Sequence, residues 1–338
     1  MPYEALMADK GVLDTLLTSI KNDAVAHAYL FEGEEGLQKR QSAAYFASAM
    51  LCESKEDVPC GQCENCIQAF SKNNPDIKRM SLSDITSKKS IGADEIRSII
   101  SDVYTRPFKS SKKIYIIEEG DALTVQAQNA MLKVLEEPPE YAVFIICVSN
   151  AELILPTVRS RSRIVRFMPS SDAQIAEYVK RKYPHMASRA DFVASVSGGV
   201  LGRADFICSN EAVMQMREEA FDFIKKLMRA RDEEDVFMVC ERFEEYKKEK
   251  SDIQDTSQLL LDFMLSFLGD MLHILSGAEN VCANKDKKSE LGELCAKTSI
   301  RRIHKAMDSV LETKQMLSRY VSHKAAIMKM ALDMFYID

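Results

Sequence analysis

The chain has 338 residues, of which 46% are hydrophobic and 28% charged, and its net charge is −6. At about 100 to 200 residues per domain, this length predicts two or three domains, each with a buried core. An acidic chain of this kind is not expected to bind nucleic acid alone through a broad basic face.

Neither secretion nor a membrane location is expected. No run approaches the ~18 apolar residues that span a bilayer. The first residues, Met-Pro-Tyr-Glu-Ala, lack the basic and then apolar plan of a signal peptide. We therefore expect a cytoplasmic protein without a membrane partner.

Helices and strands are predicted to alternate through the first half of the chain. Apolar residues recur at helical spacing over 11–22, and the apolar run 28–31 predicts a strand that ends in a glycine turn. The predicted elements that follow are helices over 38–51, 91–103 and 125–137 and strands over 113–118, 142–148 and 164–167. This alternation predicts a parallel α/β sheet.

The turn after the first strand has the outline of a phosphate-binding loop. Residues 33–40 read Gly-Glu-Glu-Gly-Leu-Gln-Lys-Arg, against the pattern G-x-x-x-x-G-K-[ST]. Gln38 stands where a glycine lets N–H groups close on phosphates, and Arg40 stands where a hydroxyl binds Mg²⁺. Gly33, Gly36, Lys39 and Arg40 therefore predict an altered nucleotide site.

Two acids end the strand that we expect over 113–118. Glu118 and Glu119 have the form of a Walker B segment, in which the first acid holds Mg²⁺ and the second polarises water. Aspartate is usual at the first position, and the longer Glu118 side chain fits a tight octahedral shell less well. Acids after an apolar strand are more often a solvated strand end, so only the nearby phosphate loop gives these two weight.

Four of the nine cysteines lie close together, at Cys52, Cys60, Cys63 and Cys66. Four thiolates in a short, turn-rich segment fit tetrahedral Zn²⁺ with no open position for water, which predicts a structural zinc module over 52–66. An iron–sulfur cluster also uses four thiolates, and small buried thiols are the third alternative. The other five cysteines are scattered and indicate buried, incidental thiols.

Basic residues gather in two places, which are Lys109, Lys112 and Lys113 and the run Arg159, Arg161, Arg163 and Arg166. Charge runs usually form ordinary solvated surfaces. Any contact of these residues with DNA is expected to be local or shared with partners.

The second half of the chain is predicted to be helical. Segments 172–183 and 187–197 form a small helical unit, and long Met-rich helices follow from about 210, with one polar loop over 276–290. We predict an α/β domain over 1–168, a helical lid over 169–208 and an all-helical domain over 209–338.

Several motifs together resemble the bacterial clamp-loader ATPase family. They are the phosphate loop with the residues before it (27–39), the cysteine module, the run Asn-Ala-Met-Leu-Lys-Val-Leu-Glu-Glu-Pro-Pro (129–139) and the run Leu-Pro-Thr-Val-Arg-Ser-Arg-Ser (155–162). The resemblance covers about residues 1–205 by motif. It implies a AAA+ type α/β domain with a zinc knuckle, a helical lid and a C-terminal collar that joins subunits.

The resemblance also implies roles for single residues. Arg161 aligns with the arginine of the family's Ser-Arg-Cys motif, which points into the ATP site of a neighbouring subunit, although Ser162 replaces the cysteine. Asn150 falls near a sensor of the γ-phosphate and Arg203 at a second sensor. Asn150 could equally be a turn residue, and Arg203 could cap or pair locally.

The resemblance therefore implies an ATPase-inactive ring member that donates Arg161 in trans and helps to load a sliding clamp on primed DNA. Its expected partners are gamma/tau and delta clamp-loader subunits, the sliding clamp and, within the assembly, DNA. ATP and Mg²⁺ are not expected to react at its own site. The alternatives are an active gamma/tau-type ATPase and a free-standing zinc-binding DNA adaptor.

Overall fold

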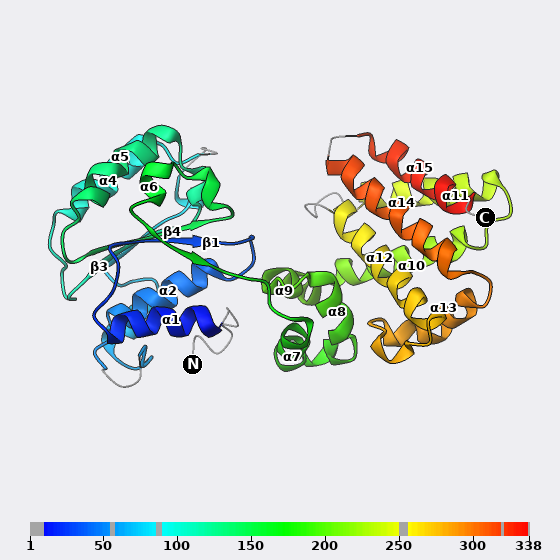
Figure 1. Cartoon of the computed structure of the whole chain (residues 1–338), viewed down its shortest axis with the longest axis horizontal. Helices are drawn as coiled ribbons and strands as arrows, with labels where there is room; N and C mark the ends of the chain where they lie inside the picture. The colour runs from blue at the N-terminus through cyan, green and yellow to red at the C-terminus, as the bar shows by residue number, and fades with distance from the viewer. Residues whose placement is uncertain (1–9, 55–57, 86–89, 250–255, 319–320, 337–338) are drawn as a thin grey trace. The chain divides into compact units, whose positions relative to one another are not determined.

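The computed structural model describes residues 10–54, 58–85, 90–249, 256–318 and 321–336. They fall into two compact units (Figure 1). The first comprises Met1–Ser170 with Val200–Gly202, and the second comprises Ser171–Gly199 with Arg203–Asp338.

The first unit is built on a five-stranded sheet in the order β2-β3-β4-β1-β5, in which every neighbouring pair is parallel. The strands are β1 (Ala28–Glu32), β2 (Ile77–Met80), β3 (Lys113–Ile117), β4 (Ala142–Val148) and β5 (Arg163–Arg166). The predicted parallel α/β fold is therefore confirmed. Strand β2 was not predicted, because this edge strand reads Ile-Lys-Arg-Met and buries only its first residue fully.

Helices cover both faces of this sheet (Figure 1). Tyr29 and Phe31 of β1 pack into one apolar core with Phe46, whereas Ala28 and Leu30 enter the other core, as the alternation of side chains along a strand requires. The helices are α1 (Lys10–Lys21), α2 (Lys39–Met50), α3 (Glu64–Phe70), α4 (Ala93–Val103), α5 (Val125–Glu136) and α6 (Pro156–Arg159).

The second unit contains no strand in the ranges that the structure describes, which agrees with the predicted helical second half. Its helices are α7 (Asp172–Lys182), α8 (Ala190–Ser197), α9 (Leu201–Ser209, whose first two residues count with the first unit), α10 (Glu211–Leu227), α11 (Glu233–Glu249), α12 (Thr256–Leu275), α13 (Lys288–Cys295), α14 (Ile300–Ser318) and α15 (His323–Phe335). The polar stretch 276–290 holds two short 3₁₀ turns, Glu279–Val281 and Lys285–Lys287, and the start of α13.

One helix corrects the expectation about apolar runs. Within α12, the window Gln258–Leu275 is long and apolar enough to cross a membrane, with a mean hydropathy of 1.4, and half of it is buried in the protein. Its buried residues include Phe263, Phe267 and Met271. Because a central helix is buried on several sides, it reads as apolar nearly all round, so this finding is weak evidence for a membrane span.

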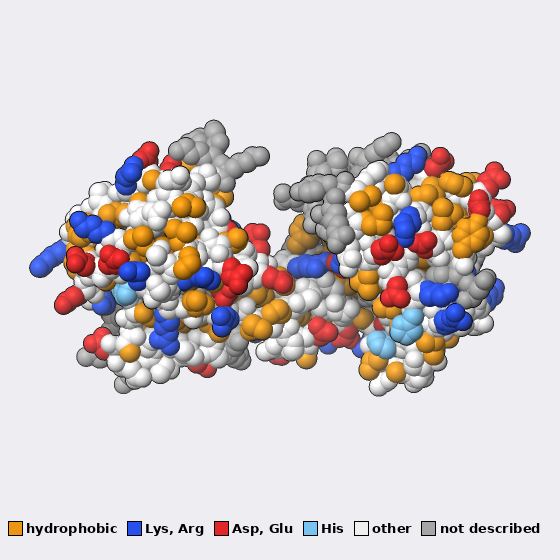
Figure 2. Space-filling view, turned by 45° about the horizontal axis from the view of Figure 1, so that its top comes forward, with side chains coloured by type: hydrophobic (Ala, Val, Ile, Leu, Met, Phe, Trp, Pro, Cys, Tyr) orange, Lys and Arg blue, Asp and Glu red, His pale blue; other side chains and the backbone are white. Residues whose placement is uncertain are grey.

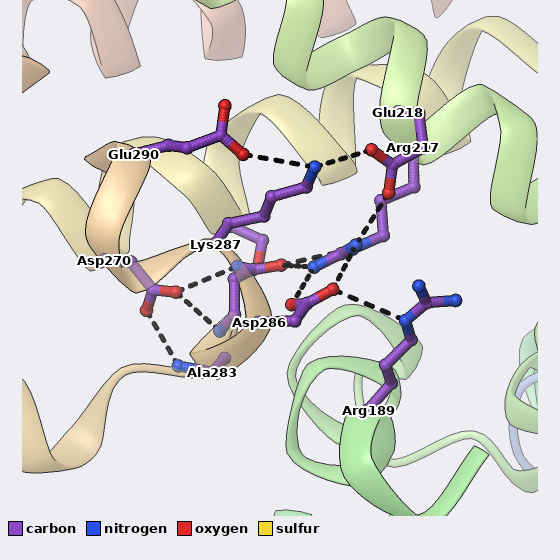
Figure 3. A network of polar contacts seen from close by, with 10 residues as sticks. Arg189, Arg217, Glu218, Asp270, Ala283, Asp286, Lys287 and Glu290 are labelled. Carbon is purple, nitrogen blue, oxygen red and sulfur yellow. Dashed lines mark hydrogen bonds and ion pairs between the residues drawn. The ribbon is translucent and has the colours of Figure 1, made fainter. Parts of the chain in front are cut away.

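A buried arginine connects the helices of the second unit (Figure 3). The Arg217 side chain on α10 is fully buried and donates to Asp286 at 2.6 Å and to Asn284 at 2.9 Å. Its guanidinium carbon lies 4.4 Å from the ring centre of Phe192 on α8 and 5.2 Å from that of Phe267 on α12. The segments predicted as lid and collar thus share one core, and their division into two domains stays a prediction.

Candidate nucleotide site and zinc module

The phosphate loop keeps a glycine-like backbone without the glycine. Gln38 directly precedes α2 and has φ 59° and ψ 25°, in the left-handed region. That conformation costs a residue with a side chain roughly 1–2 kcal/mol. The loop therefore has a left-handed backbone conformation at Gln38, which glycine adopts without strain and glutamine does not.

The loop lysine is bound to its own loop. The Lys39 ammonium donates to the carbonyl oxygen of Gly33 and, at 2.7 Å, to that of Glu34. Burial lowers the pKa of Lys39, and it outweighs the nearby Cys147, Asp121 and Glu35, which act to raise it. The Lys39 ammonium is thus held by carbonyl oxygens of its own loop.

The segment Val200–Gly202 packs directly on the loop. The N–H of Gly202 donates to the carbonyl oxygen of Gly36 at 3.0 Å. A Cβ atom added to Gly36 would lie 2.7 Å from the Val200 side chain, and the backbone there has φ +90°. Gly36 is therefore required by close packing as well as by its backbone conformation.

Arg40 forms an ion pair with one of the two Walker-type acids. Its guanidinium lies 3.0 Å from Glu119 and 3.6 Å from Glu35. Glu119 also accepts the N–H of Leu82 at 2.9 Å. The Ser81 hydroxyl donates to it as well, at 3.4 Å, so the acid expected to polarise water has three partners, while the Glu118 side chain is half-buried.

Arg161 follows α6 and lies against the end of α5. Its guanidinium donates to Glu136 and to the carbonyl oxygen of Thr157, at 2.7 Å and 2.8 Å. The side chain remains 34% exposed. Glu136 belongs to the Leu-Glu-Glu-Pro-Pro helix end, so the structure brings together two motifs that lie 25 residues apart.

Both sensor candidates have partners within the chain. Asn150 accepts the N–H of Glu152 at 2.8 Å and so caps the 3₁₀ turn Ala151–Leu153. Arg203 forms an ion pair with Asp262 of α12, inside the second unit. The Asn150 contact is the turn role that the alternative interpretation describes, whereas the partner of Arg203 lies 59 residues away in sequence. A sensor role for either residue remains a prediction.

Two aspartates that the sequence did not indicate bind backbone N–H groups near the ends of the strands. Asp121 accepts the N–H of Ser149 with both oxygens, at 3.0 Å and 2.8 Å. Asp76, at the start of β2, accepts three N–H groups from the loop before β3. An aspartate that binds backbone N–H groups has no distinctive spacing in sequence, so neither residue could be predicted. Glu136, the partner of Arg161, could have been predicted from its place in the Leu-Glu-Glu-Pro-Pro motif.

The four predicted zinc ligands come together. The sulfur atoms of Cys52, Cys60, Cys63 and Cys66 all lie within 4.8 Å of one another. Two sulfurs of a tetrahedral zinc site are about 3.8 Å apart, so a small closure of the cluster satisfies this geometry. The set fits structural Zn²⁺, and no further protein ligand is needed.

Backbone N–H groups donate to cysteine sulfurs of this cluster and so favour their thiolate form. The N–H of Cys60 points to the Cys52 sulfur at 3.4 Å, and that of Cys63 to the Cys60 sulfur at 3.3 Å. Donation from the Gln62 and Cys63 backbones lowers the pKa of Cys60 to about 6, whereas burial raises that of Cys66 to about 12. N–H···S contacts of this kind orient and support thiolate ligands.

Family models match two successive parts of the chain. Residues 8–171 match the family described as DNA polymerase III, delta subunit, and residues 214–328 match its C-terminal family. The delta' subunit of DNA polymerase III from Bacillus subtilis (strain 168) is 26% identical over 313 residues, which are 92% of this chain and 91% of that subunit.

Two further proteins are similar to this chain: one is a longer subunit, and the other has a lower sequence identity. The tau subunit of the same organism is 26% identical over 355 residues, which are 98% of this chain and 60% of that subunit. A DNA polymerase III gamma subunit-related protein of Thermotoga maritima is 18% identical over 96% of this chain and 98% of that one, with a TM-score of 0.41.

The parallel sheet, the altered phosphate loop and the helical second unit define an α/β domain of the phosphate-loop type followed by a helical region. The chain belongs to the clamp-loader subunits of DNA polymerase III, and within that family it is delta-prime-like.

Proposed function

We propose that this chain is a clamp-loader subunit that does not hydrolyse ATP at its own site and supplies Arg161 to the ATP site of a neighbouring subunit. The observation that carries the proposal is the ion pair between Arg40 and Glu119, at 3.0 Å, beside an Arg161 that remains partly exposed. In this proposal, the chain's own nucleotide site is blocked by the ion pair, whereas Arg161 remains available to the ATP site of a neighbouring subunit.

The contacts of the phosphate loop support an inactive site. Mg²⁺ needs near-ideal octahedral oxygen ligands, and Arg40 brings a fixed positive charge where the loop would offer a hydroxyl. A Mg²⁺ ion at this site would be repelled by the Arg40 guanidinium. Its binding would also require Glu119 to break its contacts with Arg40 and with the N–H of Leu82. Phosphate would also have to displace the Lys39 ammonium from the loop carbonyls.

The position of Arg161 supports a role in trans. A guanidinium donated by a neighbour stabilises the charge that develops on the γ-phosphate, with an effect of about 10³ to 10⁵ in rate. Glu136 and Thr157 hold the Arg161 side chain in one place, which limits the entropy lost when it meets a nucleotide. We propose that Glu136 positions Arg161 in this way.

The remaining proposals concern the assembly. We propose a structural zinc ion at the cysteine module, gamma/tau and delta subunits as neighbours, and primed DNA and the sliding clamp as targets of the assembled complex, in the cytoplasm. On the visible face of each unit, positive and negative side chains are interspersed (Figure 2). This distribution favours contact with DNA through the complex over a broad basic face of this chain.

An active gamma/tau-type ATPase is the second candidate, which the similarity to the Bacillus subtilis tau subunit favours. Such a subunit needs a glycine and a hydroxyl on either side of Lys39. Here Gln38 and Arg40 stand at those positions. The two candidates therefore differ in whether Lys39 is used for turnover.

Lys39→Ala in the reconstituted clamp loader tests this difference. Because the proposed function does not use the site of this chain, the variant should leave ATP turnover and clamp loading within about twofold of the wild type. The isolated wild-type chain should show no multiple turnover with ATP and Mg²⁺. Turnover by the isolated chain that Lys39→Ala abolishes would favour the active ATPase instead.

A further inference from the structure

We propose a second metal site, in the second unit, at which Asp270, His273 and Cys282 bind a divalent cation of the zinc class. Asp270 and His273 lie one turn apart on α12, and Cys282 follows the 3₁₀ turn Glu279–Val281. The site is independent of the four-cysteine module and of the proposed role of the chain.

Three different ligand types converge there. One carboxylate oxygen of Asp270, one ring nitrogen of His273 and the sulfur of Cys282 lie within 4.8 Å of one another. The Nδ1 atom of His273 lies 3.8 Å from an oxygen of Asp270. Ligand atoms around tetrahedral zinc are about 3.3–3.8 Å apart, so small side-chain rotations would complete the triangle.

Asp270 is fixed in advance of any metal (Figure 3). Its carboxylate is almost fully buried; Oδ1 accepts the N–H of Ala283 at 2.8 Å, and Oδ2 accepts the N–H and the side-chain amide of Asn284 at 2.7 Å and 2.9 Å. Each carboxylate oxygen has two lone pairs, so Oδ1, the oxygen nearer to His273, keeps capacity for a metal. Capping of the 283–284 turn explains Asp270 alone. The Cys282 thiol donates to the main-chain carbonyl oxygen of Asp270 at 3.8 Å, and this contact holds its sulfur within reach of the same carboxylate.

A cavity gives access to these ligands. It has a volume of about 690 Å³, and all three ligand residues line it. Four carboxylates line it, those of Asp172, Asp191, Asp262 and Asp270, of which Asp191 and Asp262 are paired with Lys285 and Arg203. The carboxylate of Asp270 remains available to a cation, and the open space leaves room for a water as the fourth ligand.

The ligand set selects the class of cation. Imidazole and thiolate suit Zn²⁺ and Co²⁺, whereas Mg²⁺ and Ca²⁺ require oxygen ligands. A bound ion would connect α12 to the segment after Val281. That segment includes Asn284, which accepts two N–H groups of the buried Arg217. The ion would therefore stabilise the core of the second unit.

Metal titration of the full chain tests the site. The purified chain, with its four-cysteine module already filled, should take up one more equivalent of Zn²⁺ or Co²⁺ in calorimetry. With Co²⁺, a thiolate-to-metal absorption band should accompany that equivalent, and Cys282→Ser should remove the band. His273→Ala should weaken the binding at least about tenfold, since even the loss of an outer partner costs 10- to 100-fold.

Two controls keep the result specific. His304→Ala removes another exposed histidine, on α14, and should leave the binding unchanged. Cys60→Ser with Cys63→Ser destroys the four-cysteine module and should leave the second equivalent in place. The absence of a second equivalent in the wild type, or binding that survives both His273→Ala and Cys282→Ser, would overturn the proposal.

Discussion

The guanidinium of Arg40 lies 3.0 Å from a carboxylate oxygen of Glu119, and this ion pair joins the start of α2 to the end of β3. Glu119 stands where a Walker-type site has the acid that polarises water, and here its carboxylate is paired with a residue of the phosphate loop. The altered phosphate loop is thus tied to the segment after β3 by an ion pair within the chain.

Restoring the loop should restore nucleotide binding. The double variant Gln38→Gly with Arg40→Ser gives the sequence Gly-Lys-Ser and frees Glu119 from its cation. We expect its affinity for ATP with Mg²⁺ to rise at least about tenfold over the wild type, equivalent to about 1.4 kcal/mol. Calorimetry measures this directly, and equal affinity of the two proteins would show that Arg40 does not close the site.

Gln38→Gly alone should stabilise the protein. Its φ of 59° is strained for glutamine and free for glycine, so we expect a gain of about 1 kcal/mol in the free energy of unfolding. Gln41→Gly is the matched control, since this exposed residue lies inside α2 and should cost about 0.5–1 kcal/mol. Urea unfolding compares them, and a loss in both variants would contradict the strain at Gln38.

Removal of zinc should disrupt the cysteine module. Cys63 both belongs to the cluster and caps α3 through its sulfur. Cys63→Ser should lose the tightly bound zinc equivalent in elemental analysis and speed proteolysis near residues 52–66, because metal binding and local folding are coupled. Cys240→Ala, at a buried thiol of α11, should retain the metal. Full zinc content in Cys63→Ser would rule out the four-thiolate site.

Asp76 should contribute stability that depends on pH. Burial acts to raise the pKa of Asp76, but the N–H groups of Lys109, Phe108 and Ser110 together hold it below its ordinary value. Since the folded pKa is depressed, the contribution is present above the unfolded value of about 3.9 and is lost as pH falls through the folded pKa.

Asp76→Asn should therefore lower the free energy of unfolding by about 1–3 kcal/mol at pH 7. The difference from the wild type should shrink below about pH 4. Asp94→Asn is the control, because that side chain is 87% exposed and its substitution should change little. A difference between Asp76→Asn and the wild type that is unchanged at acid pH would contradict the assigned contacts.

The sequence was informative wherever a pattern is local. Alternating apolar runs predicted four of the five strands, and the spacing of Cys52, Cys60, Cys63 and Cys66 predicted a cluster that the fold does bring together. Strand β2 escaped because Ile-Lys-Arg-Met has no period-two pattern, and its pairing with β3 is decided by partners far along the chain.

Long-range charge pairing could not be predicted. Two of the partners of Arg217, Asn284 and Asp286, lie 67 and 69 residues away, and a basic residue on a helix is ordinarily exposed. The contact of Arg161 with Glu136 likewise depends on how α5 and α6 pack. Such pairs are set by tertiary structure, so motifs indicate the residues but not their contacts.

The turnover number of the reconstituted clamp loader with Arg161→Ala is the most direct test of the proposed role in trans. Arg163→Ala, an exposed arginine of β5, serves as the matched control, and gel filtration verifies assembly in both cases. We expect Arg161→Ala to lower ATP turnover by about 10³-fold at the affected site while the complex stays intact and Arg163→Ala remains near the wild type. An assembled Arg161→Ala complex that hydrolyses ATP at the wild-type rate would contradict the account.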